Sequence, residues 1–104
     1  MRGSSDQDQY QCRDTTVSLQ KRKESAAQLR AMRKQRGLTF EAVHESSQSI
    51  AKWLGRKEFT IPPSRLHDYE VRGVVPSIFR IYTLARIYRI SIFQILAWYG
   101  IPKR

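Results

Sequence analysis

Apolar residues recur along most of the chain at intervals of three and four, the spacing that places side chains on one face of an α-helix. This pattern predicts a first helix over residues 21–37, where Leu29 and Met32 form a narrow apolar stripe before Gly37. A second helix is predicted from Thr39, a residue suited to an N-cap, to a stop at Gly55. Its predicted buried positions are Val43, Ile50 and Leu54.

A third, shorter helix is predicted over Ser64–Gly73, directly after two prolines that suit a helical first turn. Leu66, Tyr69 and Glu70 lie three and four apart, so we expect them to share the side that faces the protein. The other side chains point elsewhere and can form hydrogen bonds: Ser64, Arg65, His67, Asp68 and Arg72. An apolar inner side with a polar, partly cationic outer side is what a major-groove reading helix requires.

Two further helices are predicted near the C-terminus. One opens at Pro76-Ser77 and runs to about Tyr88, and Ser91 with Gln94 forms a capping-box signature for the next. Their predicted buried stripes are Ile78, Ile81, Leu84, Ala85 and Tyr88, and then Ile92, Ile95, Leu96 and Tyr99. No segment alternates strictly between apolar and polar residues over the length of a strand, so the predicted fold is all-α with five helices.

The domain organisation follows from where the apolar pattern begins. Residues 1–20 are polar and lack an apolar period, which predicts a disordered arm, and residues 21–104 form one predicted helical domain. The chain does not open on an apolar run, so we expect neither a signal peptide nor a transmembrane helix. Cys12 is the single cysteine, which fits a reducing compartment, and the expected location is the cytoplasm.

A net charge of +10 favours an anionic partner, with nucleic acid first and an anionic membrane surface second. The membrane alternative lacks a long amphipathic helix with free apolar residues. Cys12, His44 and His67 have no zinc-site spacing, so neither a metal nor another cofactor is expected. The sequence contains no recognisable nucleophile–base set, glycine-rich phosphate loop or carboxylate pair, so we do not expect an enzyme.

Several segments in order resemble a known family. They are Leu29-Arg30 through Arg33, Gly37-Leu38-Thr39, Leu66 to Gly73, Pro76-Ser77-Ile78 with Leu84-Ala85, and Ser91 before Ile95-Leu96. Together, over residues 25 to 99, they resemble the five-helix domain of phage repressor and Cro-like helix-turn-helix regulators. The resemblance implies that double-stranded DNA is the partner and that the third helix enters its major groove.

Carried over position by position, the resemblance places the base-reading side chains of the third helix at Pro63, Ser64, Arg65, His67 and Asp68. It also implies an ion pair between Arg33 in the first helix and Glu70 in the third. The predicted phosphate contacts are Thr39, Arg56, Lys57, Arg72 and Arg80.

Each of these assignments has an alternative. Arg65 can bond guanine O6 and N7 together, or it can contact a phosphate or remain an ordinary surface arginine. Ser64 is either the helix N-cap, which is favoured because serine is a preferred residue there, or a phosphate ligand. His67 and the arginines and lysine of the phosphate set can instead be solvent-exposed surface residues.

The chain departs from the family pattern between Leu38 and Leu66, which are farther apart than the family's spacing. The extra residues lengthen the predicted second helix by about two turns and enlarge the following loop, so the tight turn of the motif is missing. Phe40 occupies a position where the family often has a phosphate-binding amide. Asp68 adds a negative charge to the reading side, although a carboxylate can accept from cytosine N4.

These observations predict a sequence-specific DNA-binding transcriptional regulator. The fourth and fifth helices carry more apolar surface than one core stripe needs, which favours a homodimer through them. The surplus residues are Phe79, Tyr82, Ile87, Phe93 and Trp98. The alternative is a protein-interaction module on the same helical fold, with Trp53, Phe59 and Ile61 as its anchors. Trp53 and Phe59 can instead cover the core of the lengthened second helix.

Overall fold

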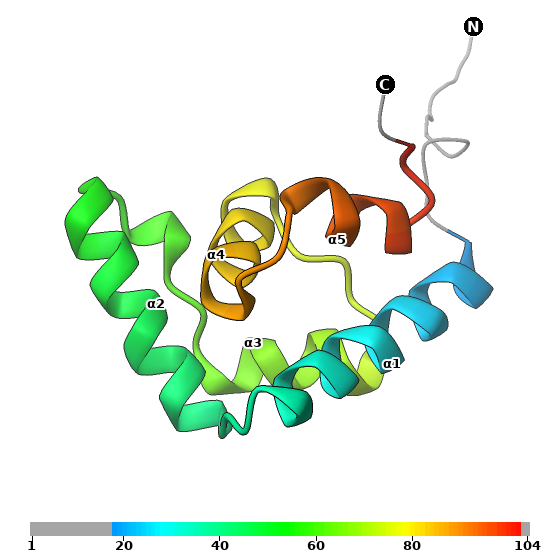
Figure 1. Cartoon of the computed structure of the whole chain (residues 1–104), viewed down its shortest axis with the longest axis horizontal. Coiled ribbons are helices and arrows are strands. Elements are labelled where there is room, and N and C mark those ends of the chain that lie inside the picture. The colour runs from blue at the N-terminus through cyan, green and yellow to red at the C-terminus, as the bar shows by residue number, and fades with distance from the viewer. Residues whose placement is uncertain (1–17, 103–104) are drawn as a thin grey trace, which may run out of the picture.

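The computed structural model describes residues 18–102, and every regular element in that range is helical (Figure 1). The elements are α1 (Leu19–Gln35), α2 (Phe40–Leu54), the short 3₁₀-helix η1 (Lys57–Phe59), α3 (Pro63–His67), its π-helical continuation η2 (Asp68–Arg72), α4 (Ile78–Tyr88) and α5 (Ile92–Trp98). The prediction of an all-α fold with five α-helices is therefore confirmed for this part of the chain.

The N-terminal boundary of the helical part differs from the prediction. Ser18 caps α1, and its hydroxyl oxygen accepts a hydrogen bond from the Lys21 N–H at 3.1 Å. Residues 19 and 20, which were assigned to the disordered arm, are helical. The helix begins inside this polar stretch because Ser18 serves as its N-cap. The rest of the predicted arm, including Cys12, lies outside the described residues.

Caps begin α2, α4 and α5 at the residues that the sequence indicated. The Thr39 hydroxyl accepts from the Ala42 N–H, and α2 ends at Gly55 in the left-handed conformation, with φ of 75°. Ser77 caps α4. Ser91 caps α5, but its hydroxyl accepts from the Phe93 N–H. In a capping box, the hydroxyl would accept from the N–H of Gln94 instead.

The core lies where all five helices converge. Its fully buried side chains come from every α-helix: Leu29, Val43, Leu66, Leu84, Tyr88 and Ile95. In Figure 1, α1 and α2 lie along two edges of the molecule, with α4 and α5 between them. α3 packs against α2, and its continuation η2 packs against α1. Most residues of the apolar stripes predicted from the sequence therefore meet in one cluster.

Several predicted positions differ from the structure. Ile50 and Leu54, predicted to be buried on α2, are only half-buried and lie outside the core cluster. Ile78 was assigned to the buried stripe of α4, yet it is 57% exposed, because the first turn of that helix has not reached the core. Trp53, for which the sequence left open either an anchor role or cover for the lengthened α2, is 67% exposed and does not cover the core. Phe59, by contrast, is half-buried and packs edge-on against Phe79 and Tyr82.

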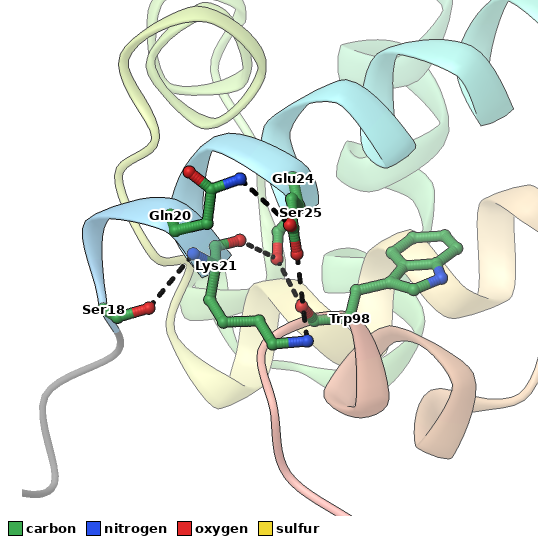
Figure 2. A network of polar contacts seen from close by, with 6 residues as sticks. All are labelled: Ser18, Gln20, Lys21, Glu24, Ser25 and Trp98. Carbon is green, nitrogen blue, oxygen red and sulfur yellow. Dashed lines mark hydrogen bonds and ion pairs between the residues drawn. The ribbon is translucent and has the colours of Figure 1, made fainter.

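Polar contacts close α5 onto α1 (Figure 2). The Ser25 hydroxyl oxygen is buried and lies 2.7 Å from the backbone carbonyl oxygens of both Lys21 and Trp98. The hydroxyl proton can serve one carbonyl at a time, so one bond lies within α1 and the other ties it to the last turn of α5. On the outer side of α1, Gln20 and Lys21 contact Glu24.

Tyr88 generates a prediction about alkaline stability. Burial raises its pKa well above the usual value for tyrosine, and the nearby Glu70 carboxylate adds to the effect. The unfolded chain therefore loses this proton at about pH 10 while the folded chain keeps it, so stability should fall above pH 10 by about 1.4 kcal/mol per pH unit for this residue.

Tyr88→Phe tests this expectation. The Tyr88 hydroxyl is buried without a hydrogen-bond partner among the described residues, so the variant should unfold with nearly unchanged free energy at pH 7. In urea titrations between pH 9.5 and 11, its stability should fall less steeply than that of the parent protein. Equal slopes would show that Tyr88 keeps its ordinary pKa.

Candidate nucleic-acid interface

The continuous segment of α3 and η2 has two different sides. Leu66, Tyr69 and Glu70 are buried against the protein, as their spacing predicted. On the other side, four of the five polar residues identified from the sequence are exposed: Ser64, Arg65, His67 and Arg72. The segment therefore presents a polar, cationic outer surface on a firmly packed base.

The residues at the two ends of this segment start and end the helix as the sequence predicted, with one exception. Pro63 is the first helical residue, and Gly73 ends the segment in the left-handed conformation, with φ of 72°. The N-cap is Pro62, which supplies no side-chain bond, and Ser64 lies within the first turn. The N-cap interpretation of Ser64 is therefore wrong, because the two prolines start the helix before that residue.

The ion pair implied by the family resemblance is present. Arg33 Nε donates to Glu70 Oε2 at 2.7 Å, and a second guanidinium nitrogen donates to Oε1 at 3.0 Å. The side chains are 13% and 1% exposed, and hydrogen bonding to Glu70 raises the pKa of Arg33 although burial opposes it. This two-bond contact joins α1 to η2, and so sets the position of the helical segment relative to α1.

Phe40 has a role that sequence reasoning missed. Its ring lies 4.5 Å from the Arg33 guanidinium carbon, and its edge contacts the His67 ring at a centroid distance of 6.3 Å. At the position where the family often binds phosphate with an amide, this protein thus has an aromatic cover for the buried ion pair. The sequence shows only that Arg33 precedes Phe40 by seven positions, and this spacing alone does not predict that the guanidinium lies against the ring.

Asp68 lies between two arginines of the outer surface. Its carboxylate oxygens are 3.5 Å from Arg65 Nη1 and 3.6 Å from Arg72 Nη1. The aspartate is only partly accessible, whereas both arginine side chains are more than half exposed. The negative charge of Asp68, which lies among the predicted base-reading positions, is thus flanked by two cations. Because Arg65 and Arg72 lie three and four residues from Asp68, helical spacing could have indicated both ion pairs.

The predicted phosphate contacts do not form one group. Arg80 is half-buried, and donates to the Thr60 carbonyl at 2.9 Å and to the Tyr69 hydroxyl at 3.0 Å. The guanidinium therefore ties the α2–α3 connection to η2 and is not a free surface cation, and its contact with phosphate stays a prediction. Arg56 pairs with Glu58 at 3.6 Å and covers the Phe79 ring. Arg56 and Lys57 follow the end of α2, which Figure 1 shows well away from α3.

Thr39 lies at the opposite end of α2, where its hydroxyl is engaged as the N-cap. Of the predicted phosphate set, Arg72 shares the outer surface with Arg65 and His67, and Thr39 directly precedes Phe40, whose ring contacts His67.

The long connection between α2 and α3 is fixed by Ile61, which is fully buried. Its N–H donates to the Ser47 hydroxyl at 2.9 Å, and its carbonyl oxygen lies 3.0 Å from His44 Nδ1. Ile61 is thus a core residue and not an exposed anchor, and His44 has a backbone partner. These bonds hold the connection against α2 in the absence of a tight turn.

Residues 18–102 contain no group of three or more side chains arranged to hold a metal ion, and no helix in this range has the length and apolarity needed to cross a membrane. Comparisons of the chain with protein-family models, curated proteins and solved structures find no match.

The buried ion pair generates a stability prediction. Glu70→Gln keeps the side-chain shape but leaves the Arg33 charge without its counter-ion, so the free energy of unfolding should fall by about 3 kcal/mol. Glu24→Gln is a matched control at an exposed ion pair and should change it by less than about 0.5 kcal/mol. Chemical denaturation measures both, and equal stability of the Glu70→Gln variant and the parent would contradict the structural role.

Proposed function

We propose that this protein is a sequence-specific regulator of transcription that binds double-stranded DNA through α3 and η2, with its helices arranged as in phage repressor and Cro-like domains. The observation that carries the proposal is the two-sided segment: Leu66, Tyr69 and Glu70 anchor it, while Arg65, His67 and Arg72 are exposed. A net charge of +10 supports an anionic partner, because phosphate neutralisation supplies much of the affinity for DNA.

In the proposed complex, the outer residues have separate tasks. Arg65 reads a guanine through O6 and N7, and Ser64 and His67 contact neighbouring base edges. Arg72, at the end of the segment, contacts a phosphate and sets the register. Asp68 holds Arg65 and Arg72 by its two ion pairs, and can itself accept from a cytosine amino group.

A homodimer through α4 and α5 completes the proposed regulator, since two copies would place two reading segments on one face of the duplex. Ile78 on α4 and Phe93 on α5 are large apolar side chains with about half of their surface exposed. Sedimentation at high micromolar concentration tests this part: a 12.2 kDa monomer throughout would contradict it.

A second candidate function is a protein-interaction module, and the observation in its favour is Trp53. This tryptophan is largely exposed near the end of α2, and the guanidinium carbon of Arg86 lies 5.3 Å from its ring centroid. Tryptophan and arginine are enriched among residues that dominate protein–protein binding energy. In that case Trp53→Ala would abolish partner binding, and Arg65→Ala would not affect it.

Selection of duplexes from a random pool distinguishes the two functions. A sequence-specific regulator should enrich one motif, ideally an inverted repeat, and bind it at least about 10³-fold more tightly than a scrambled duplex at physiological salt. Steeply salt-dependent binding without an enriched motif would contradict sequence-specific reading and would favour the interaction module.

Arg65→Ala then tests the reading helix. Loss of a two-bond guanine contact should weaken binding to the selected site by about 1–3 kcal/mol and relax preference at one base pair. Arg56→Ala removes the same charge at the distant end of α2, and should not change the sequence preference. If both variants weaken all duplexes alike, Arg65 contacts no base.

Asp68→Asn provides a separate test of the same surface. Removing the carboxylate releases Arg65 and Arg72 and adds one net positive charge, so affinity for a scrambled duplex should rise. The ratio between selected and scrambled affinities should fall, because the arginines lose their fixed positions. Binding titrations measure this ratio, and an unchanged value would show that Asp68 does not position them.

A further inference from the structure

A groove of about 630 Å³ lies between α1 and η2, on a part of the surface that the proposed reading of bases does not use. One wall is a face of α1, and the other is formed by the segment from Glu70 to Gly73. The α1 face carries alanines in its middle turns, at Ala26, Ala27 and Ala31, whose small side chains leave the space open. Val71, 57% exposed, adds an apolar side chain opposite.

Cations surround this apolar floor. Arg22 and Lys23 lie at one end, and Arg30 and Lys34 lie two to three turns farther along α1. None of these four pairs with a carboxylate among residues 18–102. The Nε of Arg22 is buried and has no hydrogen-bond partner in the described part of the chain.

The single carboxylate that lines the groove does not offset these cations. Glu70 is bound by two nitrogens of Arg33, and its side chain is 1% exposed. Arg72, the fifth cation of the lining, pairs with Asp68, and its side chain is 69% exposed. The groove therefore combines an apolar floor with a surplus of positive charge at both ends.

We propose that this groove binds an acidic amphipathic segment of a partner protein. The chemistry that fits is a helix with an aliphatic side chain directed at the alanines and Val71, and with carboxylates on either side of it. Arg22 and Arg30 are eight residues apart, about 12 Å along the helix axis, so the matching carboxylates lie about two helical turns apart. This proposal does not depend on the DNA-binding function.

Nucleic acid fits the groove less well than an acidic helix. Single strands bind basic grooves largely by stacking bases on aromatic rings, and the residues that line this groove include no aromatic side chain. An apolar floor also offers nothing to a phosphate backbone. Charge complementarity together with a small aliphatic pocket favours a carboxylate-bearing peptide.

The probe for the test is a fluorescein-labelled 16-residue peptide with leucines on one face and glutamates two turns apart on its flanks, compared with a scrambled peptide of the same composition. Fluorescence anisotropy with the full chain measures binding. We expect the patterned peptide to bind at least about tenfold more tightly than the scrambled one. Equal binding of the two peptides would overturn the proposal.

Two charge variants locate the site. Arg30→Gln with Lys34→Gln removes two exposed groove cations, and Lys52→Gln with Lys57→Gln removes two exposed cations elsewhere. The first pair should weaken peptide binding by about tenfold and the second by less than about twofold. Equal losses would show that the peptide responds only to net charge.

Ala27→Gln tests the groove itself without a change in charge. Ala27 is exposed and glutamine is a good helix former, so the fold should persist while the longer side chain fills the floor. Binding of the patterned peptide should fall by at least about fivefold. An unchanged affinity for the peptide would overturn the proposal. A mixed-sequence DNA duplex serves as a second control. If the Arg30→Gln, Lys34→Gln variant loses as much affinity for this duplex as for the peptide, the proposal is also overturned.

Discussion

The ion pair between Arg33 and Glu70 is the contact on which the rest of the candidate interface depends. Burying two charges is unfavourable unless geometry and further bonds compensate, and here both conditions hold. The guanidinium makes two bonds to the carboxylate, a third to the Leu38 carbonyl at 2.8 Å, and lies under the Phe40 ring. One side chain thus joins α1, the start of α2 and the π-helical end of the α3 segment. It sets the side from which Arg65 and Arg72 extend.

The second constraint is the lengthened connection between α2 and α3. A tight turn fixes two helices by its own backbone geometry, whereas a longer connection needs contacts along its length. The protein supplies them through backbone groups: Ile61 is bonded to Ser47 and lies against His44, and the Thr60 carbonyl accepts from Arg80. Arg80 also bonds Tyr69, so the connection, α4 and η2 are tied at one residue. The extra length therefore changes the chain path without loosening the α3 segment.

Much of the fold could be predicted from the sequence, because caps and apolar periods are local signals. The candidate site was less accessible, because its contacts join distant residues. Arg80 looks like a free surface cation until the fold brings Thr60 and Tyr69 to it. Trp53, by contrast, lies off the face of α2 that buries Val43, Ser47 and Ala51, so helical spacing alone could have indicated its exposure. The pairing of Asp68 with its neighbours likewise follows from helical spacing and could have been recognised.

The most direct measurement is an amide NMR titration of the ¹⁵N-labelled protein with duplex DNA, comparing the parent protein with Arg65→Ala. We expect the largest shift changes at residues 64–72, with smaller changes around residues 33 and 40, which support the α3 and η2 segment. In the variant, changes at the reading residues should shrink while those near Arg72 persist. Changes centred on Trp53 and the end of α2, with residues 64–72 unaffected, would contradict DNA reading by α3.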